Sequence, residues 1–162
     1  MGVEMFRVDE RMLHGQVVTT FSKVMNIDEY IVVNDEVCKD ENERTLLELA
    51  VPAGADFDCV SCDTFAKIDA DNDYWGNHTF VVFRYIDDAL ACARKGVKID
   101  KLNVGGMYSR PNRPTEKEYG PALNVDDHDI ECFRELEKLG VELIYRVSFY
   151  FKGEPLKNKV KY

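Results

Sequence analysis

The stretch MFRVDERMLHGQVVTTFSKVMNIDEYIVVND, residues 5–35, decides the fold. It opens with the short run Met5–Val8, continues with helical spacing after His14, and closes with the uninterrupted apolar run Tyr30–Val33. An uninterrupted run of this kind is typical of a central strand that is covered on both faces. The order strand, helix, strand predicts a βαβ unit and therefore parallel pairing.

Within the helix of this unit, the spacing places Val17, Phe21 and Val24 on one face, which we expect to be buried. Asn26 is a typical stop. The same alternation continues along the chain. It predicts strands at Phe57–Val60, Thr79–Phe83, Leu102–Val104 and Val141–Val147. It predicts four further helices, over Asp40–Ala50, from Asp63 to Ile68, from Asp87 or Asp88 to Gly96, and from Asp126 to Gly140. In the first of these we expect Leu46, Leu47 and Ala50 to face inward. In the last we expect Ile130, Phe133, Leu136 and Leu139 to face inward.

Three segments lack a clear period. Residues 69–73 are acidic and predict a solvated loop, and residues 105–124, rich in Gly and Pro, predict a long irregular connection. In the tail, residues 148–162, an edge strand is one option. The length of 162 residues suits one domain over residues 1–162. The predicted fold class is a single-domain α/β protein with a mainly parallel open sheet and helices on both faces.

The charge balance of the chain limits the kinds of binding partner that we expect. The chain has 21 Lys and Arg against 30 Asp and Glu, a net charge of −9, which opposes non-specific binding to nucleic acid. It shows no signal segment and no apolar run near the roughly 20 residues that a membrane helix needs. We therefore expect a cytoplasmic protein.

The five cysteines are an odd number in mostly apolar contexts, which favours reduced core thiols over disulfides. Cys59 and Cys62 have the spacing of half a metal or redox motif, but no second pair follows, and His78 and His128 lack zinc-ligand spacing. We expect no metal site. The sequence also has no phosphate-binding Gly-rich loop with Lys-Ser/Thr and no GxGxxG, so ATP and NAD are not expected.

Ligands of open α/β sheets gather at the carboxyl ends of strands. This rule selects the segment Asp9–Gly15, the pair Asn34 and Asp35, Arg84, and the segment Asn103–Gly106. Asn34 and Asp35 are also compatible with ordinary loop chemistry, and the two glycines of the last segment with a simple turn. His78 and His128 receive no role.

The first of these segments brings His14 to the start of a helix, where unpaired backbone amides and the helix dipole stabilise a phosphoryl group. An imidazole with an intrinsic pKa near ~6.5 is a competent nucleophile at neutral pH. Arg11 adds a permanent cation, and Asp9 orients the loop. The alternatives are a surface or capping histidine and an Asp9–Arg11 surface ion pair contributing roughly 0–1 kcal/mol. Three further residues are candidates for binding the phosphoryl group or for shaping its loop. Arg7 can pair with Asp9, and Gly15 allows the backbone to approach the phosphate closely. Gln16 can donate a neutral hydrogen bond.

The segment Arg7–Val17, RVDERMLHGQV, closely resembles the active loop of the enzyme IIB components of the mannose/fructose/sorbose family of the bacterial phosphoenolpyruvate-dependent sugar phosphotransferase system. Ile31–Val37, Ala50–Gly54 and Leu102–Met107 are similar to the same family. The resemblance departs after Gly106, in residues 108–119, and in the tail from Val147.

This resemblance implies a phosphotransferase that carries the phosphoryl group on Nδ1 of His14, with Arg11 binding its oxygens. It implies a IIA phosphohistidine protein as donor, membrane IIC and IID components that present the sugar, peripheral association with that transporter, and no metal or organic cofactor. Two other functions stay open. One is a regulatory module phosphorylated on the same histidine, and the other is a thiol oxidoreductase using Cys59 and Cys62. The sequence leaves open which sugar is carried and whether the chain forms a homo-oligomer.

Overall fold

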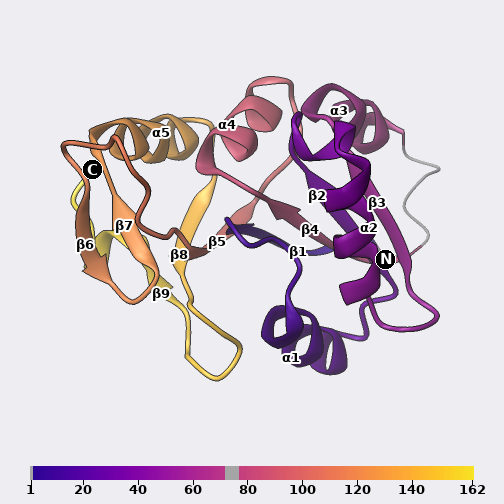
Figure 1. Cartoon of the computed structure of the whole chain (residues 1–162). Helices are drawn as coiled ribbons and strands as arrows, with labels where there is room; N and C mark the ends of the chain where they lie inside the picture. The colour runs from indigo at the N-terminus through magenta and orange to yellow at the C-terminus, as the bar shows by residue number, and fades with distance from the viewer. Residues whose placement is uncertain (1, 72–76) are drawn as a thin grey trace.

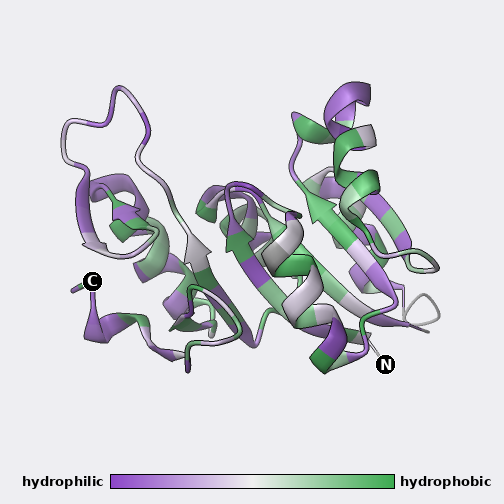
Figure 2. Ribbon diagram, turned by 60° about the horizontal axis from the view of Figure 1, so that its bottom comes forward, coloured by the Kyte–Doolittle hydropathy of each residue, from purple (hydrophilic) through white to green (hydrophobic). Residues whose placement is uncertain are grey.

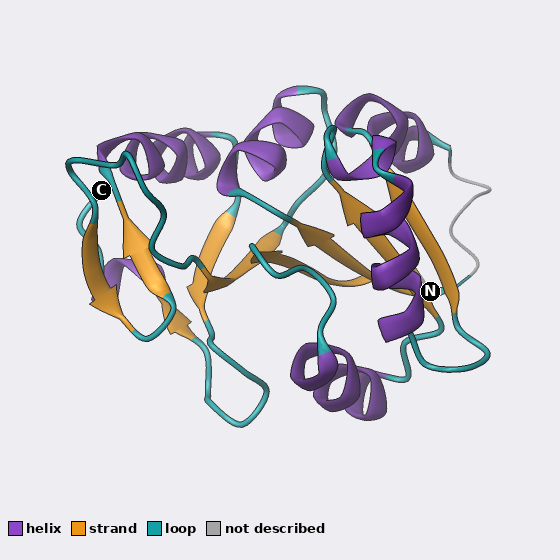
Figure 3. Cartoon of the chain, viewed as in Figure 1, coloured by secondary structure: helices purple, strands orange, loops and turns teal. Residues whose placement is uncertain are grey.

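The computed structural model describes residues 2–71 and 77–162, and over these residues strands and helices alternate along most of the chain (Figures 1 and 3). The elements are β1 (Gly2–Asp9), α1 (Gly15–Met25), β2 (Glu29–Val33), η1 (Val37–Lys39), α2 (Glu41–Ala50), β3 (Asp56–Val60), α3 (Cys62–Ala70), β4 (His78–Phe83), α4 (Ile86–Arg94), β5 (Lys101–Gly106), β6 (Lys117–Gly120), β7 (Leu123–Val125), α5 (Asp127–Lys138), β8 (Glu142–Tyr145), β9 (Glu154–Pro155) and η2 (Leu156–Asn158).

Within the described residues, the main sheet has seven strands in the order β3-β2-β4-β1-β5-β8-β9. All its pairs are parallel except that of β8 with β9. β1 lies at the centre, where Val8 pairs with Phe83 of β4 and with Val104 of β5. Every residue of β2 is buried, as the uninterrupted apolar run predicts. The predicted fold class is confirmed. The carboxyl end of β1 lies in the middle of the edge formed by the carboxyl ends of the parallel strands.

The helices cover both faces of this sheet (Figure 1). Val17, Val18 and Phe21 of α1 pack with Leu47 of α2 on one face. α3, α4 and α5 contribute Phe65, Leu90, Cys92, Phe133 and Leu136 to the core on the other. Figure 2 shows the hydrophobic colour in the strands and along parts of the helices, whereas the loops are largely white or hydrophilic. Among residues 2–71 and 77–162, the helices are all too short or too polar to cross a membrane.

Three residues that were predicted to face inward are exposed. Val24 is 55% exposed, because the buried stripe of α1 passes through Phe21 to the partly buried Met25. Leu46 is 68% exposed, whereas Leu47, which lies 100° further around α2, is buried as predicted. Leu139 is 50% exposed, because α5 has already ended and Leu139 is its C-cap.

Two helix starts also differ from the prediction. α3 is capped by Ser61, whose Oγ accepts from the amide of Thr64, and not by Asp63. α4 begins at Ile86, and Asp88 reaches back to accept from the amide of Tyr85 at 2.9 Å. The predicted loop over residues 69–73 is wrong at its start, because α3 continues to Ala70, and residues 72–73 lie outside the described residues.

The connection after β5 is more regular than predicted. β6 and β7 form an antiparallel hairpin, with Leu123 and Val125 buried, so residues 105–124 are only partly irregular. The edge-strand option for the tail is confirmed, because β9 pairs with β8 and the residues after it bury Leu156 and Val160. β8 ends at Tyr145 and not at Val147. The backbone carbonyls of Arg146 and Val147 accept hydrogen bonds from the side chain of Arg7 in β1 rather than from a neighbouring strand.

Candidate functional site

The loop between β1 and α1 is held in shape by its own backbone and by Asp9. The side-chain carboxylate of Asp9 accepts a hydrogen bond from the backbone amide of Arg11 at 3.0 Å. The backbone carbonyl of Asp9 accepts one from the backbone amide of Met12 at 2.9 Å. Met12 has the left-handed φ of 59°, and Met12 and Leu13 are buried. These contacts turn the chain sharply and anchor it in the core, so His14 arrives at the start of α1 in a fixed position.

His14 is the N-cap of α1, in extended backbone conformation, and its side chain is 30% exposed. Its ring makes no capping hydrogen bond, so the first amides of the helix remain directed at any anion placed beside it. His14 Nε2 lies 3.3 Å from Asp9 Oδ2. A carboxylate only accepts, so Nε2 carries the ring proton in this hydrogen bond, and Nδ1 keeps the lone pair of the neutral ring.

Arg7 lies behind Asp9 and is fully buried. Its Nε and Nη2 each lie 3.3 Å from Asp9 Oδ2. Burial alone would raise the pKa of Asp9, but the hydrogen bond with His14 and the charge of Arg7 outweigh it, so the pKa of this carboxyl lies below its ordinary value. Asp9 is therefore a carboxylate at neutral pH and a charged acceptor for the imidazole.

Arg7 also fixes the tail of the chain. Its Nη1 and Nη2 donate to the carbonyls of Arg146 and Val147, both at 2.8 Å. A Cβ on Gly105 would overlap the Arg146 carbonyl and the Arg7 guanidinium, and a Cβ on Gly106 would overlap the Asp9 carboxylate. The interpretation of these glycines as a simple turn is wrong, because both belong to β5 and leave room for the buried ion pair.

A cavity of about 530 Å³ opens beside His14. Asp9, Arg11 and His14 line its polar side together with Tyr108 and Ser148. The guanidinium carbon of Arg11 lies 4.2 Å from the centre of the Tyr108 ring, a cation–π contact that holds this cation at the cavity. The apolar side of the cavity is lined by Val17, Phe21, Val147 and Phe151.

The other predicted site residues have partners elsewhere. The Asn34 amide nitrogen donates to Asp88 at 3.0 Å, and Asp35 accepts from the amide of Cys62 at 2.9 Å. Arg84 pairs with Glu43 at 3.6 Å. Of the described residues among the predicted candidates, the cavity gathers Asp9, Arg11, His14 and Gly15, with Arg7 behind them, and leaves out Asn34, Asp35 and Arg84. Gln16 lies in the first turn of α1.

Four cavity residues that lie far from the loop and α1 in the sequence were missed by reasoning from the sequence: Tyr108, Val147, Ser148 and Phe151. The available signal was that residues 108–119 and the tail from Val147 depart from the family pattern. Both segments bring an aromatic ring to the cavity.

The cysteines behave as predicted. All five are free, and four are buried, with Cys38 partly so. Burial raises the pKa of Cys59 to about 12. A thiol with such a pKa is protonated and a poor nucleophile at neutral pH, so the burial of Cys59 argues against a thiol oxidoreductase that uses Cys59 and Cys62.

Comparison with known proteins agrees with the geometry. The family described as PTS system sorbose subfamily IIB component matches residues 3–159. The chain is 41% identical over 147 residues to the sorbose-specific EIIB component of Klebsiella pneumoniae, covering 91% of this chain and 88% of that one. It is 34% identical over 146 residues to the mannose-specific EIIAB component of Escherichia coli K12, covering 90% of this chain and 44% of that one.

Among solved structures, the IIBSor domain of the sorbose permease from Klebsiella pneumoniae matches with a TM-score of 0.89 at 38% identity, covering 98% of this chain and 96% of that one. Proteins of this family transfer a phosphoryl group from a IIA protein to a sugar, together with membrane IIC and IID components. The chain therefore belongs to the sorbose subfamily of IIB components of the sugar phosphotransferase system, and it is a phosphotransferase.

Proposed function

We propose that His14 is the residue that carries the phosphoryl group in this chain, and that Nδ1 is the atom that holds it. The observation that carries the proposal is the 3.3 Å contact of His14 Nε2 with the buried carboxylate of Asp9. This contact favours the tautomer with the proton on Nε2, in which Nδ1 has the lone pair needed for attack on phosphorus.

Two in-line displacements follow from this arrangement. In the first, Nδ1 attacks phosphorus, and the bond from phosphorus to the imidazole of the IIA phosphohistidine breaks, with its electron pair returning to that ring. In the second, a sugar hydroxyl attacks the phosphorus, the P–Nδ1 bond breaks, its electron pair returns to His14, and the hydroxyl proton passes to water. The contribution of the protein is mainly positioning and electrostatic stabilisation.

Each charged neighbour has a distinct part in this proposal. Arg11, held against Tyr108, binds the phosphoryl oxygens, and the first amides of α1 add a contribution of roughly 0.3–1 kcal/mol. Asp9 stabilises the positive charge that the ring gains when Nδ1 is phosphorylated. Arg7 does not reach the phosphoryl group, because it is fully buried, and its part is to keep Asp9 ionised and in place.

The partners of this chain in particular are part of the proposal. We expect it to work at the inner face of the membrane, receiving phosphate from its own IIA protein and delivering it to a sugar held by its own IIC and IID proteins. The similar proteins are named for sorbose, mannose and fructose, so hexoses are the first sugars to test.

Labelling by a phosphorylated IIA protein tests the assignment. Wild-type protein should take a label that is stable in alkali and lost in acid, and peptide mapping should find it on His14. His14→Ala should take none. His78→Ala is the matched control, because His78 is an exposed histidine that also contacts a carboxylate, Glu4 at 2.7 Å. A label that survives in His14→Ala, or that maps to another residue, would overturn the proposal.

A further inference from the structure

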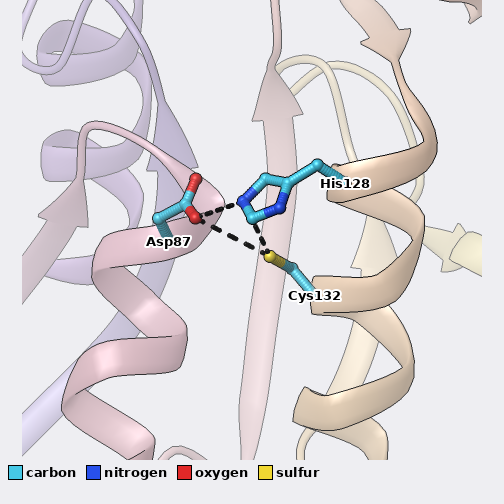
Figure 4. A group of neighbouring side chains, drawn as sticks. All are labelled: Asp87, His128 and Cys132. Atoms are coloured by element: carbon cyan, nitrogen blue, oxygen red, sulfur yellow. Dashed lines mark hydrogen bonds and ion pairs between the residues drawn. The ribbon is translucent and has the colours of Figure 1, made fainter. Parts of the chain in front are cut away.

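A second group of ligand-forming side chains lies between α4 and α5, on the face of the sheet opposite α1. His128 and Cys132 are four residues apart on α5 and therefore share one face of the helix. Both side chains point toward Asp87 of α4 (Figure 4). His128 Nε2 lies 2.5 Å from Asp87 Oδ1, Cys132 Sγ lies 3.6 Å from His128 Nε2, and Cys132 Sγ lies 3.8 Å from Asp87 Oδ1.

These separations are close to those of a tetrahedral metal site. Bonds of about 2.0–2.1 Å to nitrogen and oxygen and about 2.3 Å to sulfur place neighbouring ligand atoms about 3.3–3.6 Å apart. The two distances from Cys132 Sγ agree with this geometry. The His128–Asp87 contact must lengthen by about 0.8 Å to fit it. Their side chains are 65% and 51% exposed, so both have room to rotate, whereas the buried Cys132 is the fixed corner.

We propose that Asp87, His128 and Cys132 bind a divalent first-row transition-metal ion, Zn²⁺ foremost, with water in the fourth position. The donor set selects the class of ion. Thiolate and imidazole favour zinc and its neighbours over Mg²⁺ and Ca²⁺, which prefer oxygen donors. The ion replaces the hydrogen bond and ion pair that otherwise join Asp87 to His128.

The surroundings of the three residues are compatible with a cation. A cavity of about 200 Å³ adjoins them and is also lined by Glu131 and Glu135. The cation on this cavity, Arg94, is already paired with Glu135. Glu131 is paired with Arg134 at 2.9 Å, so Asp87 is the carboxylate that meets the ion, and its charge favours a bound dication.

Binding exchanges protons and water for metal bonds. Burial raises the pKa of Cys132 to about 12, so the thiol is protonated before binding. The Sγ–H bond breaks as the sulfur–metal bond forms, and the proton passes to the solvent. The proton that His128 Nε2 donates to Asp87 also leaves by exchange with the solvent, so that the neutral ring carries its proton on Nδ1. Nε2 then binds the ion through the lone pair so freed, and all but one of the ion's water ligands leave. No electron is transferred. The product is a metal link between α4 and α5.

Titration of the chelator-treated full chain with Co²⁺ tests the site directly, because a thiolate bound to Co²⁺ gives a charge-transfer band and a tetrahedral site gives intense visible bands. Zn²⁺ should displace the cobalt and raise the melting temperature of the protein. His128→Gln, Asp87→Asn and Cys132→Ser each remove one ligand. We expect each substitution to weaken metal binding at least about 100-fold. Loss of a residue that only hydrogen-bonds to a metal ligand weakens binding by up to about this factor, and loss of a ligand itself should cost at least as much.

Two matched controls separate this site from chance binding. His78→Gln removes the other exposed histidine–carboxylate contact, and Cys38→Ser removes a thiol outside the cluster. Both should bind cobalt as the wild type does. The proposal is overturned if the wild type shows no thiolate-to-cobalt band, or if that band persists unchanged in His128→Gln. His128 is exposed, so its replacement leaves the fold intact and the test remains decisive even if Cys132→Ser fails to fold.

Discussion

Asp9→Asn replaces a buried charge with a neutral side chain of the same shape, and its effect can be worked out from the contacts of Asp9. Arg7 and Asp9 are each about 1% exposed, and their charges compensate one another. Removing one partner of a buried ion pair costs about 3–5 kcal/mol. Arg7 keeps its hydrogen bonds to the carbonyls of Arg146 and Val147, so we expect a loss near the lower end, about 3 kcal/mol.

The same substitution should slow phosphoryl transfer. His14 Nε2 loses a charged acceptor, and a hydrogen bond to a charged group contributes roughly 1.5–3 kcal/mol. If this contribution is made in the transition state, the rate of transfer falls about 10-fold to 150-fold. The two effects are measured separately, by urea unfolding and by the rate of transfer from phosphorylated IIA to folded protein.

The pH dependence of stability gives a second readout of Asp9. Its pKa is lower in the folded protein than in the unfolded chain, where it is about 3.9. The stability that it contributes is therefore complete above about pH 4 and is lost as the pH falls through the folded pKa. Asp9→Asn should lack this acid-side loss, so its stability should approach that of the wild type as the pH falls.

A surface ion pair provides the control for Asp9→Asn. Asp58 lies 3.8 Å from Arg44, and both side chains are partly exposed to solvent, in contrast to the buried pair of Arg7 and Asp9. Asp58→Asn should therefore cost less than about 1 kcal/mol and leave the transfer rate unchanged. If Asp9→Asn unfolds with the wild-type free energy and transfers at the wild-type rate, the inferred part of the buried pair is wrong.

Three further variants, two of them with a matched control variant, test the surroundings of His14. Gly106→Ala should lower stability by about 1–3 kcal/mol in thermal or urea unfolding, because its methyl group meets the Asp9 carboxylate, whereas Gly15→Ala, which meets no atom within 4 Å, should not lower it. Arg11→Ala should slow transfer from phosphorylated IIA at least about 10-fold, since a charge-assisted bond is lost, and change the free energy of unfolding by less than about 0.5 kcal/mol. Tyr108→Ala should slow transfer about 2-fold to 5-fold by releasing Arg11, and Tyr108→Phe, which keeps the aromatic face, should not; equal rates in the two variants would contradict the cation–π role.

The parts of the fold that follow local patterns could be predicted from the sequence. The run Tyr30–Val33 is apolar without interruption because β2 is covered on both faces. The helix faces were less certain, because neighbouring apolar residues lie only 100° apart around a helix, and this is why Leu46 was expected to face inward together with Leu47. The β6–β7 hairpin gave no signal, since Lys117–Gly120 is short and largely polar.

The candidate site divides in the same way. Asp9, Arg11 and His14 come from one continuous segment, so their proximity was predictable. The remainder of the cavity depends on contacts between distant parts of the chain. Arg7 holds the carbonyls of Arg146 and Val147, about 140 residues away, and so ends β8 early and brings the tail to the cavity. Local sequence patterns carry no information on such a contact.

Nuclear magnetic resonance of the histidine side chains, labelled with ¹⁵N, tests the central claim most directly. Before phosphorylation, the spectrum should show the ring proton of His14 on Nε2. After incubation with phosphorylated IIA, coupling between phosphorus and nitrogen should place the phosphoryl group on Nδ1 of the same ring. A proton on Nδ1 in the free protein, or a phosphoryl group on Nε2 or on any other residue, would contradict the account.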